Sequence, residues 1–317
     1  MVRRFPAVAL GALVLALAGC GGDDGGGGGS SGKQATVRVQ DTAGVPSAFL
    51  EYGVKQGFFK KRKLDVQVKP SQGGATVVPA VTSGSVDIGG SNLVSVLLAQ
   101  SKNIPLKVVA PGTFVAKQDF SGIIVAKDSD ISDPKDLEGK TLAVNTLKNV
   151  AEVTAKESLS KKGVDVSKVK LTEVDFPDMV PAVEQGRVDA AFAIEPFVTA
   201  GKAAGLKVVD RPYLGTRPGL QIGCYFTSEK YLAENKDVVA RFREGVGETA
   251  QAIADDPTAF RKFLPEASEI PPPAAMKAVL PAWKPKSDEA SVDLTAELMQ
   301  KYGLTESKPD TKDALAE

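Results

Sequence analysis

Short polar residues and glycines follow each predicted strand of this 317-residue chain, and they are the residues best suited to hold a ligand. Most offer hydroxyl, amide or backbone N–H groups and none is Arg or Lys, which suits a small ligand held by neutral donors. Ser, Thr and Asn before a helix also serve as ordinary N-caps, so each has a structural alternative. The candidates are Thr42, Gly44, Ser71, Gly73, Gly74, Ser91, Asn92, Asn145, Thr146, Asp178 and Glu195.

Asp178 and Glu195 are the titratable members of this set. A carboxylate beside a cleft disfavours an anion and suits a ligand that donates a hydrogen bond or carries an amine. A carboxylate-based lyase or dehydratase needs two titratable groups in one cleft, and these two residues form the pair that the sequence offers. Such an enzyme is the alternative to simple binding.

The chain contains no histidine. This absence excludes Ser-His-Asp and Cys-His nucleophilic sites and the H-E-x-x-H zinc motif. The sequence also has no D-x-D-x-D-G calcium loop, no cysteine cluster and no G-x-x-x-x-G-K-[ST] phosphate loop. We therefore expect no catalytic residue, no metal site and no cofactor.

The elements that position the candidates occur twice along the chain. The segment V-P-A-V-T-S-G-S-V-D at 78–87 matches V-P-A-V-E-Q-G-R-V-D at 180–189 in seven of ten positions, at an offset of 102. An alternating strand pattern opens each copy, T-V-R-V-Q-D from Thr36 and T-L-A-V-N-T from Thr141. Strands that alternate with helices predict an α/β fold with a mostly parallel sheet in each copy.

The repeat also carries paired residues with structural roles. Asp87 and Asp189 stand at equivalent strand openings, so we expect them to support the fold rather than the ligand. Pro79 and Pro181 fall inside short predicted helices, where proline is tolerated in the first turn.

The patterns predict the following layout. In the first copy we expect strands at 36–40, 64–68 and 86–89 and helices at 46–57, 76–83 and 93–100. In the second copy we expect strands at 142–144, 170–174 and 188–194 and helices at 149–161 and 179–185. We interpret the β-rich runs 121–127 and 220–227 as two crossings that form a hinge between lobes. A helical tail follows at 235–254, 257–264, 273–280 and 291–302, so lobe 1 comprises 35–122 and 221–317, and lobe 2 comprises 123–220.

The N-terminal residues have the pattern of a secretion signal. Arg3 and Arg4 precede an apolar run at 7–18, which is too short to span a bilayer and typical of a signal peptide. It ends in L-A-G-C, which resembles the bacterial lipoprotein signal, so we expect removal of residues 1–19 and lipidation of Cys20. The Gly/Ser-rich residues 20–34 then form a flexible tether. A signal peptide with a chance cysteine is the alternative.

The mature chain is close to neutral. Loss of Arg3 and Arg4 leaves 37 basic against 39 acidic residues, a net charge of about −2. No bulk positive charge recruits nucleic acid or anionic lipid. With Cys20 acylated, no disulfide framework is possible, and the apolar run I-G-C-Y-F predicts that Cys224 is buried.

Four segments together resemble one protein family. They are Q-G-F-F-K-K-R-K-L-D-V at 56–66, S-G-S-V-D-I-G-G at 83–90, D-L-E-G-K-T-L-A-V at 136–144 and A-I-E-P-F at 193–197. They resemble the nitrate, sulfonate and taurine type of ABC-transporter binding proteins, which also includes binders of the thiamine pyrimidine precursor. The resemblance extends from about Thr36 to Gly303.

The resemblance implies a type II periplasmic-binding-protein fold and delivery of a small-molecule solute to an ABC permease and its ATPase. Fungal-type pyrimidine synthases with this fold consume one of their own histidines, so this chain cannot run their chemistry. We expect a monomer, lipid-anchored outside the cytoplasmic membrane, that captures a solute of the sulfonate, nitrate, taurine or pyrimidine-precursor class by closure of two lobes. An envelope enzyme on this fold and a ligand-sensing partner of a membrane receptor are the alternatives.

Overall fold

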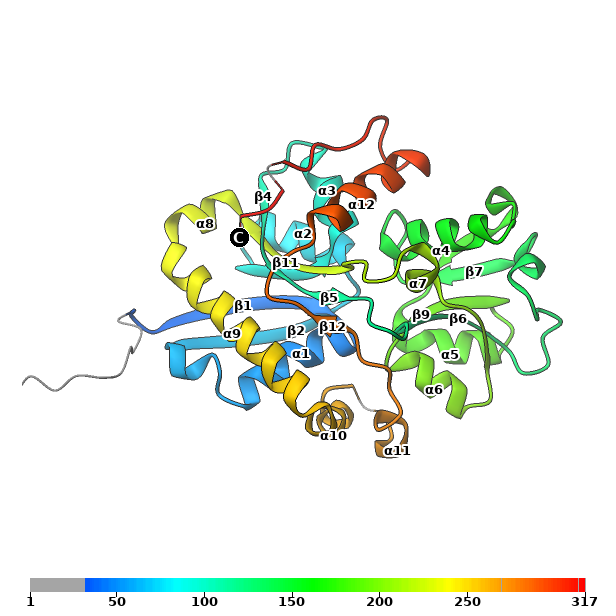
Figure 1. Cartoon of the computed structure of the whole chain (residues 1–317), viewed down its shortest axis with the longest axis horizontal. Helices are drawn as coiled ribbons and strands as arrows, with labels where there is room; N and C mark the ends of the chain where they lie inside the picture. The colour runs from blue at the N-terminus through cyan, green and yellow to red at the C-terminus, as the bar shows by residue number, and fades with distance from the viewer. Residues whose placement is uncertain (1–31, 269, 313, 317) are drawn as a thin grey trace, which may run out of the picture.

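The computed structural model describes residues 32–268, 270–312 and 314–316. The expected signal peptide, Cys20 and most of the tether lie outside the described residues. The described chain forms two five-stranded sheets, which lie side by side along the long axis of the molecule (Figure 1). None of the described helices is long and apolar enough to span a bilayer.

The first sheet has the strand order β2-β1-β3-β11-β4. Strand β1 pairs in parallel with β2 and β3, whereas β11 runs antiparallel to β3 and β4. The parallel strands alternate with helices that cover the sheet, as the sequence predicted. Its strands are β1 (Ala35–Thr42), β2 (Leu64–Ser71), β3 (Ile88–Asn92), β4 (Leu106–Pro111) and β11 (Gly223–Ser228), and its intervening helices are α1 (Val45–Lys55), α2 (Gly74–Thr82) and α3 (Leu93–Gln100).

The second sheet repeats this order as β8-β7-β9-β6-β10. Strand β7 is parallel to β8 and β9, and β6 is antiparallel to β9 and β10. The repeat in the sequence therefore corresponds to two sheets with the same strand order. The elements are β6 (Ser121–Val125), β7 (Thr141–Val144), β8 (Lys170–Glu173), β9 (Ala190–Ile194), β10 (Lys207–Asp210), α4 (Val150–Lys161), α5 (Phe176–Glu184), α6 (Phe197–Ala203) and α7 (Pro212–Thr216).

The C-terminal tail packs mainly on the first sheet. Helix α9 buries the face that contains Val239, Phe242, Val246 and Ile253, and it contacts α1. Helix α12 contacts both α3 and α4, so it touches both halves (Figure 1). The tail consists of α8 (Glu229–Glu234), α9 (Lys236–Asp255), α10 (Pro257–Ser268), α11 (Pro272–Ala275) and α12 (Glu289–Lys301), and its strand β12 (Ala282–Trp283) pairs with β5 (Thr113–Phe114).

The interpretation of 121–127 as a crossing was wrong, and that of 220–227 holds only for its first three residues. Strand β6 lies inside the second sheet and β11 inside the first, and the chain passes between the sheets at 115–120 and 217–222 instead. Both strands are almost wholly buried, and buried backbone needs hydrogen-bond partners, which neighbouring strands supply. The second sheet thus begins at Ser121, two residues before the expected lobe boundary.

Two helix predictions also differ from the structure. Helices α2 and α5 begin at Gly74 and Phe176, so Pro79 and Pro181 are their sixth residues and lie beyond the first turn. The helix expected at 273–280 ends at Ala275. The backbone N–H of Val279 donates to Glu195 Oε1 instead of continuing a helix, and Pro281 follows.

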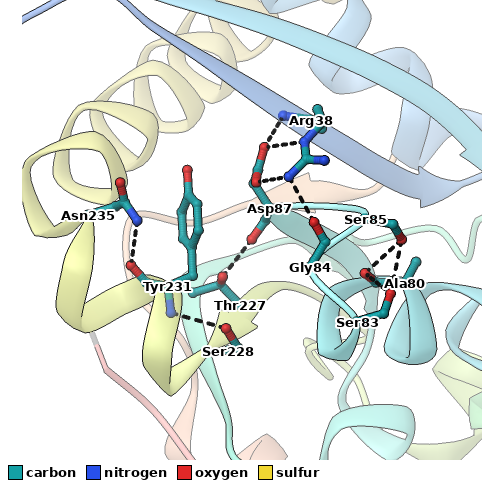
Figure 2. A network of polar contacts seen from close by, with 10 residues as sticks. All are labelled: Arg38, Ala80, Ser83, Gly84, Ser85, Asp87, Thr227, Ser228, Tyr231 and Asn235. Atoms are coloured by element: carbon teal, nitrogen blue, oxygen red, sulfur yellow. Dashed lines mark hydrogen bonds and ion pairs between the residues drawn. The ribbon is translucent and has the colours of Figure 1, made fainter.

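The paired aspartates of the repeat join neighbouring strands. The Asp87 carboxylate accepts hydrogen bonds from the backbone N, Nε and Nη2 of Arg38, at 2.8, 3.0 and 2.6 Å (Figure 2). The Asp87 carbonyl accepts a fourth from Thr227 Oγ1 on β11. In the second copy, Asp189 Oδ2 accepts from the backbone N of Thr141 at 2.8 Å. Each aspartate, which directly precedes the third strand of its copy, therefore bonds to the first strand, β1 or β7. These bonds agree with the expected structural role.

Replacing these two aspartates should separate their contributions to stability. Asp87 is 8 % exposed and bonded to a guanidinium, whereas Asp189 is exposed and makes one bond to a backbone amide. We expect Asp87→Ala to lower the free energy of unfolding by about 1.5–3 kcal/mol, and Asp189→Ala by less, about 0.5–1.5 kcal/mol. Urea unfolding of both variants measures the difference, and equal losses would contradict the assignment.

Candidate functional site

A cavity of about 40 Å³ lies where the two halves meet. It is lined by residues of both halves, at the carboxyl ends of strands, where open α/β sheets bind ligands. No Lys or Arg is among its lining residues. From the first sheet and its helices come Asp41, Thr42, Ser91, Asn92, Cys224 and Tyr225, and from the second half come Phe120, Asn145, Asn149, Phe176, Ile194 and Tyr213.

Four of the eleven predicted ligand-binding residues line this cavity: Thr42, Ser91, Asn92 and Asn145. Asn92 is also an N-cap, since its Oδ1 accepts from the backbone N of Ser95 at 3.0 Å. Asn149, which the sequence analysis did not select, caps α4 in the same way through Ala151. The N-terminal ends of α3 and α4 therefore both lie at the cavity and offer it partial positive charge.

The other predicted residues serve local structure. Ser71 Oγ lies 2.6 Å from Thr76 Oγ1 and accepts from the backbone N of Gly73 at 3.3 Å, within the turn into α2. A Cβ on Gly74 would lie 1.9 Å from Ser95 Oγ, so glycine permits the close packing of α2 on α3. Thr146 Oγ1 accepts a hydrogen bond from Asn149 Nδ2.

Gly44 and Gly73 lie where the halves touch. A Cβ on Gly44 would lie 3.0 Å from the Glu195 carbonyl, and one on Gly73 would lie 3.2 Å from Asn145 Nδ2. Both glycines have positive φ angles, 105° and 126°, which other residues rarely adopt. Asn145 Nδ2 also donates to the carbonyl of Gln72 at 2.7 Å, which links the two halves at the edge of the cavity.

Glu195 is a buried connector outside the cavity lining. Its carboxylate accepts from Thr199 Oγ1 at 2.8 Å, from Thr199 N at 3.1 Å and from Val279 N at 3.3 Å, and its carbonyl accepts from Val45 N at 3.2 Å. Burial raises the pKa of Glu195, and the hydrogen bonds from Thr199 and Val279 partly offset this shift. Asp178 is exposed in the first turn of α5, so the structure does not bring this pair to the cavity.

The comparison with protein families identifies the family of this chain. Residues 47–260, more than half of the chain, match the family described as NMT1/THI5 like. The chain belongs to the NMT1/THI5-like family.

The proteins to which this chain is similar include both a binding protein and an enzyme. The chain is 24% identical over 205 residues to the taurine-binding periplasmic protein of Escherichia coli (strain K12), covering 65% of this chain and 62% of that protein. It is 21% identical over 222 residues to the 4-amino-5-hydroxymethyl-2-methylpyrimidine phosphate synthase of Schizosaccharomyces pombe, covering 66% and 62%. The match thus spans less than two thirds of the length of these relatives.

The solved structures agree on the architecture. The alkanesulfonate-binding protein SsuA of Xanthomonas axonopodis pv. citri, solved with MOPS, superimposes with a TM-score of 0.77 at 18% identity, over 90% of this chain and 99% of that one. The predicted periplasmic-binding-protein fold is thereby confirmed for this NMT1/THI5-like chain.

Asp41 is the functional candidate that the sequence analysis missed in this NMT1/THI5-like chain. It stands one residue before the end of β1, lines the cavity and is 2 % exposed. Its Oδ1 accepts from the backbone N of Thr42 at 2.7 Å, whereas its buried Oδ2 accepts no hydrogen bond from the described residues. Burial raises the pKa of Asp41 to about 7, partly offset by the Thr42 amide and the Tyr225 hydroxyl.

Aromatic rings form much of the remaining wall. The Phe176 ring stacks on Phe197, outside the lining, at 6.0 Å between centroids, and the Phe120 ring contacts Tyr213 at 5.1 Å. Rings held in this way present apolar faces to a ligand. Within the described parts of the chain, no three His, Cys, Asp or Glu side chains gather where they could share a metal ion.

The Asp41 carboxyl should make stability depend on pH. Its pKa of about 7 in the folded state lies above the value of about 3.9 in an unfolded chain, so the folded state holds the proton to higher pH. Rising pH between about 4 and 7 therefore lowers the free energy of unfolding. We expect the melting temperature of the wild type to fall more steeply over pH 5–7.5 than that of Asp41→Asn. The exposed Asp65→Asn control on β2 should follow the wild type, and parallel curves for Asp41→Asn would contradict this prediction.

Proposed function

We propose that this chain is the solute-binding component of an ABC importer and catalyses no reaction. The observation that carries the proposal is the cavity between two similar α/β halves, lined by hydroxyl, amide and aromatic side chains. Similarity to the taurine-binding protein supports the class of function, and similarity to SsuA supports the fold that performs it. We propose solutes of the sulfonate, taurine, nitrate or aminopyrimidine class, held in part by Thr42, Ser91, Asn92 and Asn145.

Closure of the two halves around the solute is the proposed mechanism. Hinge closure is the established motion of periplasmic binding proteins, and the chain segments 115–120 and 217–222 would form the hinge here. Hydrogen bonds from Asn145 to Gln72 and from Val45 and Val279 to Glu195 join the halves and are the contacts that closure would form. A solute shifts this equilibrium only by its greater affinity for the closed form.

In the proposed mechanism, closure would also form contacts between α4 and the end of α12. Glu157 of α4 accepts hydrogen bonds from Lys301 Nζ at 2.6 Å and Tyr302 Oη at 2.7 Å, at the end of α12. Burial opposes ionisation of Glu157, but the bonds from Lys301 and Tyr302 outweigh it and lower the pKa of this carboxyl. These two hydrogen bonds join the C-terminal tail to the second half, so they would favour the closed arrangement.

An enzyme on this fold is the second candidate, since the synthase from Schizosaccharomyces pombe is a relative. Two observations support binding instead. The chain contains no histidine, and neither member of the proposed catalytic pair, Asp178 and Glu195, lines the cavity. Recovery of a chemically altered solute after incubation with pure protein would favour the enzyme.

The solute should stabilise the protein and compact it. At 100-fold excess over the dissociation constant, binding adds about 2.7 kcal/mol, which raises the melting temperature by roughly 4–5 °C in a chain of this size. The radius of gyration in small-angle X-ray scattering should decrease at the same time. We would screen taurine, alkanesulfonates, nitrate and aminopyrimidines, alongside mass spectrometry of solutes that co-purify with native protein.

Asn145→Ala should reduce this ligand-induced shift, because it removes a cavity side chain and the hydrogen bond to Gln72. Asn235→Ala is the matched control, since Asn235 Nδ2 donates to the Tyr231 carbonyl at the start of α9 (Figure 2) and Asn235 does not line the cavity. No thermal shift with any solute, and no solute in native protein, would count against solute binding.

We further propose that the protein acts outside the cytoplasmic membrane as a lipid-anchored monomer that meets a permease and its ATPase. A chain released from its signal at Cys20 would carry the anchor on a Gly/Ser-rich tether. Cys20→Ser should move the protein from the membrane fraction to the soluble fraction in cell fractionation. Membrane association that survives this substitution would contradict the anchor, whereas Cys224→Ser should leave it intact.

A further inference from the structure

Asp41 is the one carboxylate that lines the cavity, and half of it lacks a partner within the described residues. The Thr42 amide donates to Oδ1 at 2.7 Å, and Oδ2 is buried without a hydrogen bond. The Tyr225 hydroxyl, which helps to lower the pKa of this carboxyl, also belongs to a residue of the cavity lining, but it donates no hydrogen bond to Oδ2. A buried acceptor that forms no hydrogen bond is costly, more so when it is charged, so the folded state retains it against a free-energy penalty.

The sheet is shaped to make room for this carboxyl group. Gly90 on β3 lies beside Asp41, and a Cβ at that position would lie 2.2 Å from Asp41 Oδ1 and 2.8 Å from Oδ2. Any side chain there would displace the carboxylate or shift the strand. The site is therefore built by two neighbouring strands rather than by a flexible loop.

No cationic side chain of the cavity lining pairs with Asp41, so a group of the ligand would have to do so. No Lys or Arg lines the cavity, and the charged side chain that shifts the pKa of this carboxyl is Glu51 on α1, which also disfavours its ionised form. An anionic group placed against Oδ2 would be repelled, whereas an N–H donor would satisfy it.

The opposite chemistry is available across the same cavity. Asn92 and Asn149 cap the N-terminal ends of α3 and α4, where partial positive charge suits an acidic or electron-rich group. Phe176 and Tyr213 supply apolar faces. A ligand with a donor nitrogen at one end and an electron-rich or planar remainder would match both sides.

We propose that the solute carries a hydrogen-bond-donating nitrogen, an ammonium or an aromatic amine, that donates to Oδ2 of Asp41. This inference rests on the proposed solute-binding function and narrows its ligand class. Among the solutes considered above, it selects amino-sulfonates such as taurine and aminopyrimidines, and it disfavours nitrate and sulfonates that lack nitrogen.

Two pairs of probes that differ by one amino group test the proposal. They are taurine with ethanesulfonate, and 4-aminopyrimidine with pyrimidine, each titrated calorimetrically into the purified mature protein at pH 8. We expect at least one amino probe to bind at least 10-fold more tightly than its partner. In Asp41→Asn this preference should fall by roughly 10- to 100-fold or disappear, whereas Asp65→Asn, exposed on the same sheet, should keep it.

The outcomes separate this inference from the proposed function. If ethanesulfonate and pyrimidine each bind the wild type as tightly as their amino partners, or if the preference survives Asp41→Asn, the nitrogen assignment is overturned while solute binding stands. If no probe binds, the assignment is overturned, and the solute found by mass spectrometry in native protein decides whether the broader function survives. The comparison within the wild type needs no variant, so a misfolded Asp41→Asn protein would not prevent a decision.

Discussion

The parallel pairing of β1 with β3 determines what the first half presents to its partner. Val39 pairs with Ile88 and Gln40 with Gly89, so the next residue on each strand, Asp41 and Gly90, come to lie together at the carboxyl edge. The same pairing in the second half, Leu142 with Ala190, brings the residues after β7 to the equivalent edge. Because parallel strands end on the same side, each half places its strand ends and helix N-termini on one face, and the cavity forms where those faces meet.

That geometry explains why a neutral, small-residue lining can coexist with a single buried carboxylate. Helix ends and N-cap amides already supply partial positive charge, so the site needs no Lys or Arg to hold an electron-rich group. Asp41 then adds the opposite polarity at one point. Its unpaired oxygen costs folding free energy, of the order of 1–3 kcal/mol, which a bound donor would return. The free energy that this oxygen costs in the empty protein would therefore add to the binding free energy of a ligand that donates to it.

Periodicity and the internal repeat were sufficient to predict the three parallel strands of each sheet, and the resemblance of four segments indicated the family. The predictions were wrong where contacts between distant parts of the chain determine the structure. The strand prediction ended at Gln40, so Asp41 fell in a loop and its burial was not foreseen, because hydrogen bonding to β2 extends β1 to Thr42. The runs at 121–127 and 220–227 had strand character, but a pattern cannot tell which sheet will pair with a strand. Four cavity residues were found because polar residues at strand ends are a local signal.

Glu195 is a polar residue at a strand end that does not line the cavity. Its hydrogen bonds join the two halves instead. It follows β9 as the candidates of the first half follow their strands, yet its oxygens are occupied by Thr199 and Val279 and its carbonyl by Val45. A residue bonded in this way cannot serve a ligand without giving up contacts between the halves. In the proposed hinge motion, opening would break the bonds to Val45 and Val279 and expose a carboxylate whose pKa burial raises, so the free-energy difference between the two proposed forms would include its hydration. In the proposed mechanism, Glu195 would therefore set part of the equilibrium between open and closed forms, while Asp41, on the opposite half, is the group that the solute itself would satisfy.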